Sequence, residues 1–412
     1  MGAASTTPLT PGKKIEYARR NGATLLSLDM TLSTAVPAEI GTLSSLTELN
    51  LGNNQLASLP PEIWTLASLE VLALHHNQLT SLPLEIGGLS SLTRLYLGGN
   101  QLASLPEEIG MLSSLTQLNL QWNQLASIPG EIGQLSSLTR LSLIANRLVA
   151  LPEEIGTLSS LMELHVSCNL LETLPPEIGE LSSLRILDLS DNKLTSIPRE
   201  IGRLSLLTEL SMFENQLASL PEEIGMLSSL AQLCIWKNRL TSLPVEIGML
   251  SSLLSLRVEC NQLTSLPKEI CALHSLKGLH LDKNRLTHIP EIIGHLTCLN
   301  DLELHGNEGL LYPPASLVTS MNCGETVNYM RTHKDTISPT GRRRHAWAGI
   351  RLMYIGQREC GGAFGRLPVE VLWRIEAFIL CDPYVGAPTV LSYQSAVDRI
   401  ASVVAAAHGA IP

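Results

Sequence analysis

Hydrophobic and polar positions alternate along most of the chain in a pattern that returns every 23 residues. Each period follows the pattern LxxLxLxxNxLxxLPxEIGxLSS, and residues 46–66 spell out the first full copy. The asparagine of the pattern recurs without a slip, at Asn54, Asn77, Asn100, Asn123, Asn146, Asn169, Asn192, Asn215, Asn238, Asn261, Asn284 and Asn307. A degraded copy stands one period upstream, with Leu26, Leu28, Val36, Pro37, Ile40 and Leu43 in register. A repeat of this length predicts a solenoid, in which each unit buries its apolar edge against the next.

Each repeat is expected to fold as a short strand, a turn and a second apolar edge. Alternate residues of a strand point to opposite sides, so Leu49 and Leu51 face inward while the residues beside them face outward. The asparagine turns the chain, because its amide can bond backbone groups that the turn leaves unpaired. Pro60 then fixes φ, and Ile63 and Leu66 follow at helix-like spacing. Stacked strands of this kind form a parallel sheet on the concave side of a curved array.

The 23-residue unit is similar to the leucine-rich repeat. The predicted fold is therefore an α/β solenoid, a horseshoe of about 12–13 such repeats, with a small C-terminal helical region. The LPxEIGxLxxLxxLxLxxNxL form resembles that of the Ras-group intracellular leucine-rich-repeat proteins, which include plant Ras-group members, animal Ras–Raf scaffolds and Scribble-type polarity proteins. A similar capping pattern stands at Asn307, Leu310, Pro313, Pro314, Gly324, Tyr329 and Arg331. The resemblance implies a signalling scaffold that binds a small GTPase, a phosphatase subunit or a polarity protein.

The domain boundaries follow from where the repeat pattern begins and ends. Residues 15–21 form an amphipathic stretch with Gly22 as a stop, which predicts a capping helix before the first repeat. At the other end the rhythm breaks, and two helical stretches offer Leu317, Met321, Val327 and Met330 to cover the last repeat. The predicted parts are an N-terminal segment with its capping helix, 1–22; the capped solenoid, 23–332; a basic linker, 333–346; and a small helical region, 347–412.

Four of the five aromatic residues between Leu46 and Gly306 stand at outward positions of the predicted sheet. Tyr96 and Trp122 lie on adjacent repeats, and so do Phe213 and Trp236. The two rings of each pair are expected to touch or nearly to touch. Such rings sometimes only pack on each other, but on a concave sheet they are typical binding anchors. The predicted partner-binding residues, including a mixed-charge rim, are His75, Tyr96, Trp122, Phe213, Trp236, Arg257 and Glu259.

The sequence predicts no catalytic residue, no metal site and no cofactor. His165, Asp188 and Ser211 stand at equivalent offsets on neighbouring strands, but a catalytic triad needs a buried base and an oxyanion hole, which an open sheet does not provide. No phosphate-binding loop, HExxH motif or carboxylate cluster with metal spacing occurs. The net charge of −10 argues against a nucleic-acid partner. We therefore expect a non-enzymatic protein-recognition scaffold.

The eight cysteines form no CxxC pair and no cluster, and the N-terminus has no apolar run. Both features favour a reducing, cytoplasmic setting. The first six residues fit the MGxxx[ST] pattern of N-myristoylation, so Gly2 is a candidate lipidation site. The second signal that a single acyl chain needs would come from four basic residues that follow, Lys13, Lys14, Arg19 and Arg20. Membrane association is expected only if Gly2 is acylated, and an ordinary N-terminus is the alternative.

A stretch near the C-terminus, LPVEVLWRIEAFIL at residues 367–380, resembles the opening helix of an F-box. The residues that carry the match and would contact an adaptor are Leu367, Pro368, Leu372, Ile375 and Phe378. F-boxes recruit an adaptor of cullin ubiquitin ligases, so the resemblance implies a substrate receptor as the alternative function. A small helical domain that packs on itself or on the solenoid is the plainer alternative.

Overall fold

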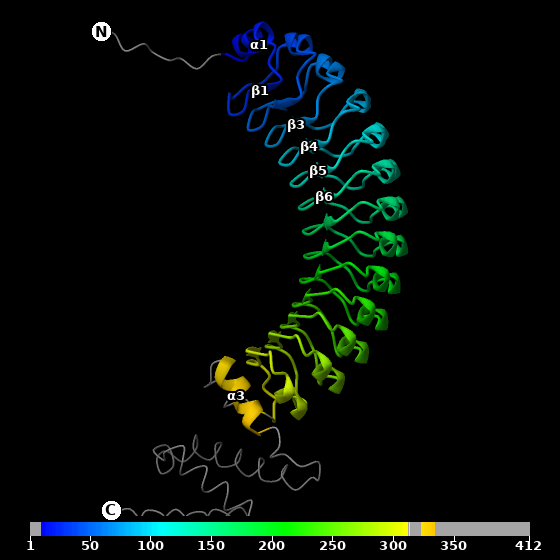
Figure 1. Ribbon diagram of the computed structural model, residues 1–412, viewed down its shortest axis with the longest axis vertical. Helices are drawn as coiled ribbons and strands as arrows, with labels where there is room; N and C mark the ends of the chain where they lie inside the picture. Colours follow the sequence, from blue (N-terminus) through cyan, green and yellow to red (C-terminus); the bar gives the residue numbers. More distant parts are fainter. Residues whose placement is uncertain (1–9, 312, 314–322, 334–412) are drawn as a thin grey trace, which may run out of the picture. The chain divides into compact units, whose positions relative to one another are not determined.

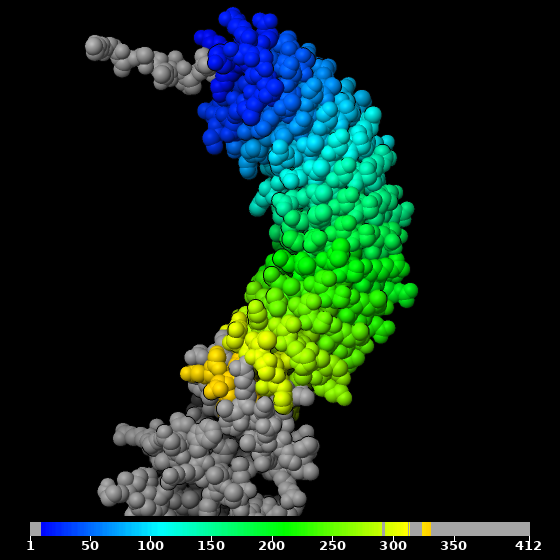
Figure 2. All heavy atoms as spheres, viewed as in Figure 1, coloured from blue at the N-terminus to red at the C-terminus, as the bar shows by residue number. Residues whose placement is uncertain are grey.

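The computed structural model describes residues 10–311, 313 and 323–333 of the 412-residue chain. These residues belong to one compact unit, Met1–Lys334. Their repeats form a curved array, in which a sheet lines the inner side and short 3-10 helices line the outer side (Figure 1). Successive repeats follow one another in chain order along the array (Figure 2). The predicted solenoid of 23-residue repeats is therefore confirmed.

The sheet of the described array is parallel, and its strands follow chain order from β1 to β13. The strands are β1 (Leu25–Ser27), β2 (Glu48–Asn50), β3 (Val71–Ala73), β4 (Arg94–Tyr96), β5 (Gln117–Asn119), β6 (Arg140–Ser142), β7 (Glu163–His165), β8 (Ile186–Asp188), β9 (Glu209–Ser211), β10 (Gln232–Cys234), β11 (Ser255–Arg257), β12 (Gly278–His280) and β13 (Asp301–Glu303). Neighbouring strands pair in register, so Leu26 lies beside Leu49 and Leu49 beside Leu72. This central leucine is buried in every strand, so each repeat covers the apolar edge of the next.

The outer edge consists of one short 3-10 helix per repeat. These helices are η1 (Ala38–Thr42), η2 (Pro61–Thr65), η3 (Leu84–Gly88), η4 (Glu107–Met111), η5 (Gly130–Gln134), η6 (Glu153–Thr157), η7 (Pro176–Glu180), η8 (Arg199–Arg203), η9 (Glu222–Met226), η10 (Val245–Met249), η11 (Lys268–Ala272) and η12 (Glu291–His295). In the first full repeat, the N–H of Ile63 donates to the carbonyl of Pro60 at 3.1 Å, and that of Leu66 to the carbonyl of Ile63 at 3.2 Å. Three residues per turn place Ile63 and Leu66 on one side of the helix, and both are buried.

The repeating asparagine joins each repeat to the one before it. In the middle of the array, Asn169 Oδ1 accepts the N–H of Leu148 at 3.0 Å. Its Nδ2 donates to the carbonyl oxygens of Leu143, Val166 and Ser167 at 2.9, 3.0 and 3.1 Å. The same arrangement recurs along the array, and the asparagine is buried in each repeat from Asn54 to Asn307. We call this series the asparagine ladder.

The residue before each ladder asparagine adopts left-handed backbone. Its φ lies between 51° and 56° in the non-glycine cases from Asn53 to Lys283, and reaches 69° at Gly99 and 72° at Gly306. This conformation costs a non-glycine residue about 1–2 kcal/mol. The ladder hydrogen bonds fix the turn that requires this backbone, so the array holds bulky residues such as Trp122 in it.

The glycine of the EIG triplet lets successive 3-10 helices approach each other closely. A Cβ on Gly225, for example, would lie 2.4 Å from the carbonyl oxygen of Glu246. Trp64 and Cys271 occupy the glycine position, and there η2 packs less closely on η3, and η11 on η12, than other successive helices do. A hollow of about 350 Å³ lies beside Cys271. Burial raises the pKa of the Cys271 thiol to about 12, so this side chain acts as an apolar spacer.

Both ends of the array are covered. Helix α1 (Pro11–Arg20) packs on η1 and β1, buries Ile15 and Ala18, and is followed by Gly22 at φ 56°. The helix overlaps the stretch 15–21 that was expected to cap the first repeat, and it begins four residues earlier. At the other end, helix α3 packs on η12 and β13.

Helix α3 (Cys323–His333) buries Val327 and Met330, two of the residues that were expected to cover the last repeat. The other two, Leu317 and Met321, lie outside the described residues. The predicted division at 332, with a linker and a helical region beyond it, stays a prediction.

Replacing one ladder asparagine tests how much the ladder contributes to stability. Asn169→Ala leaves one buried N–H and several buried carbonyls without a side-chain partner, and we expect it to lower the free energy of unfolding by about 3 kcal/mol. Urea denaturation followed by circular dichroism measures the change. Asn119→Ala is the matched control, because Asn119 is only half-buried and its Oδ1 accepts the single N–H of Gln121. An equal loss in both variants would contradict a special role of the ladder.

Candidate binding surface

The outward side chains of the sheet form parallel rows along the inner side of the array. Three rows stand six, four and two residues before the ladder asparagine, and the left-handed turn position stands directly before it. Since the strands pair in register, equivalent residues of successive repeats lie side by side. All seven predicted partner-binding residues lie in these rows. The structure divides them into two patches, one near β4 and one near β10.

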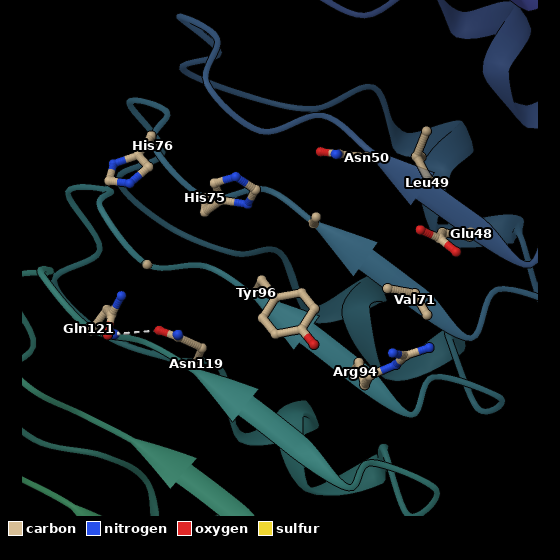
Figure 3. A pocket seen from close by; sticks show the side chains of 12 residues that line it. Glu48, Leu49, Asn50, Val71, His75, His76, Arg94, Tyr96, Asn119 and Gln121 are labelled. Atoms are coloured by element: carbon tan, nitrogen blue, oxygen red, sulfur yellow. Dashed lines mark hydrogen bonds between the residues drawn. The ribbon is translucent and has the colours of Figure 1, made fainter. Parts of the chain in front are cut away.

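In the first patch, His75, His76 and Tyr96 line a hollow of about 420 Å³ (Figure 3). Small residues, Ala73 and Gly98, stand where other repeats carry larger outward side chains, and this leaves room between the rings. The side chains of Arg94 and Gln121 also line the hollow, whereas that of Trp122 does not. The hollow was not predicted, although the small outward residues that create it are visible in the sequence.

His75 is the half-buried histidine of this hollow. Its ring meets that of His76 edge-on, with centroids 5.7 Å apart and planes at 82°. Asn53 Nδ2 lies 3.3 Å from His75 Nε2 and also donates to Asp29 Oδ1 at 3.1 Å. Burial lowers the pKa of His75, the neighbouring His76 lowers this pKa further, and Asp29 opposes the shift. The neutral imidazole is therefore favoured at pH 7, with Nε2 able to accept a hydrogen bond from Asn53.

The rings of Tyr96 and Trp122 do not form the expected pair. Among the described residues, ring contacts join His75 to His76 and Phe213 to Trp236, and none joins Tyr96 to Trp122. Tyr96 instead donates its hydroxyl hydrogen to Gln117 Oε1 at 3.1 Å. Trp122 has left the strand at the left-handed turn and is 64% exposed. Spacing alone did not reveal this difference between a strand position and a turn position.

The second patch contains the expected aromatic pair. The rings of Phe213 and Trp236 stack with centroids 4.4 Å apart and planes within 7° of parallel. Lys237 Nζ lies 4.8 Å from the centroid of Trp236 and pairs with Glu214 Oε1 at 2.7 Å. The two rings bury one face each against the other and remain partly exposed; we call this stacked pair, which is fixed on the sheet, the aromatic plate. This contact confirms only that the rings of the second pair touch.

Charged residues continue the second patch toward the C-terminal end of the sheet. Arg257 Nε and Nη2 both donate to Glu259 Oε1, at 3.0 and 2.6 Å. Glu259 is only 7% exposed, and Asp282 in the next repeat is 8% exposed. Asp282 Oδ2 lies 3.4 Å from His305 Nε2. The predicted rim therefore holds two nearly buried carboxylates beside the aromatic plate, which spacing did not indicate.

The candidate triad residues lie in register without being joined. His165, Asp188 and Ser211 occupy equivalent positions of β7, β8 and β9. However, His165 Nε2 lies 3.3 Å from Glu163 Oε2, and Asp188 Oδ1 accepts the N–H of Ser190 at 3.1 Å. Over the residues that the structure describes, no three His, Cys, Asp or Glu side chains gather as a metal site. His165 and Asp188 thus bond neighbours outside the candidate triad.

The remaining predicted sites lie outside the described residues. These are the lipidation candidate Gly2 and the adaptor-contact candidates Leu367, Pro368, Leu372, Ile375 and Phe378. Within the described ranges, every helix is too short or too polar to cross a bilayer.

Comparison with protein families identifies the repeat unit. A family model described as leucine rich repeat matches residues 44–102, 91–148 and 159–217. A second, described as leucine-rich repeat region, matches residues 233–310. Together these matches cover more than half of the chain. No curated protein sequence gives a significant match.

Several solved structures share the architecture. A leucine-rich-repeat protein of Leptospira interrogans is 42% identical, with a TM-score of 0.68, over 73% of this chain and 77% of that chain. The plant peptide hormone receptor RGFR1, solved in complex with RGF2, is 33% identical, with a TM-score of 0.59, over 71% of this chain and 53% of that chain. A TDR receptor is 28% identical, with a TM-score of 0.61, over 70% of this chain and 57% of that chain. The chain thus spans little more than half the length of the two receptors.

The lowered pKa of His75 predicts a pH-dependent stability. The unfolded chain takes up the proton near the ordinary pKa of 6.5, before the folded chain does, so stability is fully present above that pH and falls as the pH drops toward the folded pKa. We expect the urea midpoint to decrease between about pH 7.5 and about pH 5.5, and His75→Gln to remove part of this decrease. His274→Gln, the same change at an exposed residue, is the control. If His75→Gln leaves the pH dependence of the urea midpoint unaltered, burial does not lower the pKa of His75 as stated.

Proposed function

Since the chain belongs to the leucine-rich-repeat family, we propose that it is a non-enzymatic recognition scaffold that binds a protein partner on its concave sheet. The observation that carries the proposal is the stacked pair Phe213 and Trp236, held on the outward face of the sheet. An aromatic plate that is already ordered loses little entropy on binding and buries a large apolar area. Such a plate is therefore a suitable centre for a protein interface.

The first patch supports the same function. Trp122 is 64% exposed at its turn, and the hollow between His75 and Tyr96 lies one repeat away. An exposed ring beside a hollow allows a partner to be held both by a projecting anchor and by a recess. Two separate patches on one sheet favour an extended contact with a protein over a site for a small ligand.

The partner class rests on resemblance. The leucine-rich-repeat fold binds protein partners, as in the plant receptor that was solved with RGF2. The Ras-group form of the repeat in this chain favours an intracellular signalling partner, and a small GTPase is the first candidate. The cysteines support the intracellular setting, because the five whose pairing the structure describes are free: Cys168, Cys234, Cys260, Cys271 and Cys298. A cytoplasmic protein of this kind would reach a membrane through acylation of Gly2.

The alternative function is a substrate receptor of a cullin-type ubiquitin ligase. It is favoured by one sequence observation, the F-box-like run from Leu367 to Phe378. In that case the concave sheet would select the substrate, and the C-terminal run would contact the adaptor. The two functions share the recognition surface and differ in what the C-terminal region binds.

The concave surface is tested by the double variant Trp122→Ala/Phe213→Ala in the full chain. We expect it to weaken capture of the partner by about thirtyfold or more, since two interface anchors are lost. The fold should persist, because Trp122 is exposed and Phe213 is only partly buried. Affinity purification with mass spectrometry identifies the partner, and binding of the purified partner gives the fold-change.

The matched control is Met111→Ala/Met226→Ala, which removes two exposed apolar side chains from the 3-10 helices on the outer side. Urea midpoints of all variants separate lost binding from lost folding. A partner that both double variants lose equally, or that is lost only with the fold, would overturn the concave surface as the recognition site.

The ligase alternative predicts a different loss. Leu367→Asp/Ile375→Asp should release a cullin adaptor while leaving capture of the concave partner unchanged, because charges on the apolar face of the predicted helix prevent it from docking. The measurement is quantitative mass spectrometry of the adaptor against the concave partner. If the wild-type chain captures no cullin adaptor, this alternative is wrong.

A further inference from the structure

Part of the second patch, together with Asp282, forms one continuous row of side chains. Phe213, Trp236, Glu259 and Asp282 each stand two residues before a ladder asparagine in four successive repeats. Backbone hydrogen bonds keep these positions adjacent: the N–H of Glu214 donates to the carbonyl of Trp236 at 3.0 Å, and the N–H of Lys237 donates to that of Glu259 at 2.9 Å. The row therefore runs from two stacked rings directly into two carboxylates.

Glu259 has an unused acceptor at the boundary between rings and carboxylates. Arg257 donates hydrogen bonds from both Nε and Nη2 to Oε1. The enclosed Oε2, by contrast, has no hydrogen-bond partner. A guanidinium paired with both oxygens would leave no such atom. Nine-tenths of the Glu259 side chain is buried, so the missing bond leaves a desolvated acceptor uncompensated.

Two neighbouring carboxylates increase the need for a cation. Glu259 and Asp282 are both more than nine-tenths buried and lie in adjacent positions of the same row. A positive group placed against them offsets the cost of burying their charge. The side chains that contact them, Arg257 and His305, are each close to half exposed.

The rings select the shape of the cation. A planar guanidinium can stack on an aromatic plate and donate to a carboxylate at the same time, whereas an ammonium group is a compact point charge. Lys237 Nζ already lies near the Trp236 ring, where it is held by Glu214. The Trp236 ring thus already holds a positive charge in the free protein, and a guanidinium that stacks on the ring replaces it.

From this geometry we infer that the row formed by Phe213, Trp236, Glu259 and Asp282 is a subsite for an arginine side chain of the partner. The inference deepens the proposed recognition function and rests on it. The incoming guanidinium stacks on the aromatic plate and takes the place of Arg257 on the Glu259 carboxylate, which opens the enclosed Oε2 to it. Arg257, whose side chain is 43% exposed, occupies this carboxylate in the free protein and yields to the partner's arginine.

The exchange gives the subsite an unusual signature. Glu259→Gln removes the charge with little change in shape and weakens arginine binding. Arg257→Gln removes the internal competitor and therefore strengthens it. A surface that used Arg257 to hold an acidic partner would respond to the second variant in the opposite direction.

The probe is the peptide acetyl-Gly-Gly-Arg-Gly-Gly-amide, compared with the same peptide carrying uncharged citrulline. Binding to the full chain is followed by NMR on the indole N–H signals of the five tryptophans, with Trp236 assigned through Trp236→Phe. We expect a saturable shift of the Trp236 signal with the arginine peptide alone. Glu259→Gln should weaken the binding by about tenfold. Arg257→Gln should strengthen it severalfold, and Phe213→Leu provides a second loss variant that keeps the apolar volume.

Glu163→Gln is the control, because Glu163 also lies on the sheet and also pairs with an arginine, Arg140. The inference is overturned if the arginine peptide gives no saturable shift, if citrulline binds equally well, if Glu163→Gln weakens binding as much as Glu259→Gln, or if Arg257→Gln abolishes binding. Each of these results leaves the proposed function intact when the partner is still lost with Trp122→Ala/Phe213→Ala. Conversely, if the arginine peptide binds but no protein partner binds the concave sheet, the proposed function is wrong and the arginine subsite still stands.

Discussion

The hydrogen bonds of the asparagine ladder are the constraint on which the rest of the array depends. Each strand has only three residues, so the sheet alone leaves many backbone groups at its end without a strand partner. The buried amide of Asn169 serves four of them at once, and two, the Leu148 N–H and the Leu143 carbonyl, belong to the preceding repeat. Each repeat of 23 residues therefore brings its asparagine amide to the same position relative to the preceding repeat. In the first, degraded copy Thr31 stands at this position and bonds the Leu28 carbonyl with its hydroxyl at 3.0 Å, which begins the series.

The ladder also frees the neighbouring residues for recognition. The asparagine and the central leucine hold the backbone. The side chains that point outward therefore contribute little to the stability of the fold, and they differ from repeat to repeat. Trp122, Cys168 and Lys237 all occupy the same left-handed turn position. Rigid backbone with variable outward side chains is the arrangement in which anchors such as Phe213 and Trp236 can be ordered before a partner arrives.

The fold could be predicted from the sequence because the signal was repeated twelve times at a fixed period. The stacking of Phe213 on Trp236 could be predicted for the same reason, since equivalent offsets on paired strands become neighbours. The Tyr96 and Trp122 rings stand at different offsets, and the turn separates them in a way that spacing does not describe. The hollow beside His75 arises where outward side chains are small, and the unpartnered Glu259 oxygen arises because Arg257 directs both donors to the other oxygen. Such features depend on three-dimensional packing, which a linear pattern does not contain.

The two exceptions to the EIG glycine give the array internal boundaries. In a linear array each repeat is stabilised by its neighbours alone, so cooperativity passes only through the interfaces between repeats. Where Trp64 and Cys271 hold successive 3-10 helices apart, the outer edges of neighbouring repeats are less closely packed than elsewhere. The array is thus divided into a long central segment and two short ends, each of which can fray without opening the centre. The stacked Phe213 and Trp236 belong to the central segment, so local unfolding at either end leaves this plate assembled.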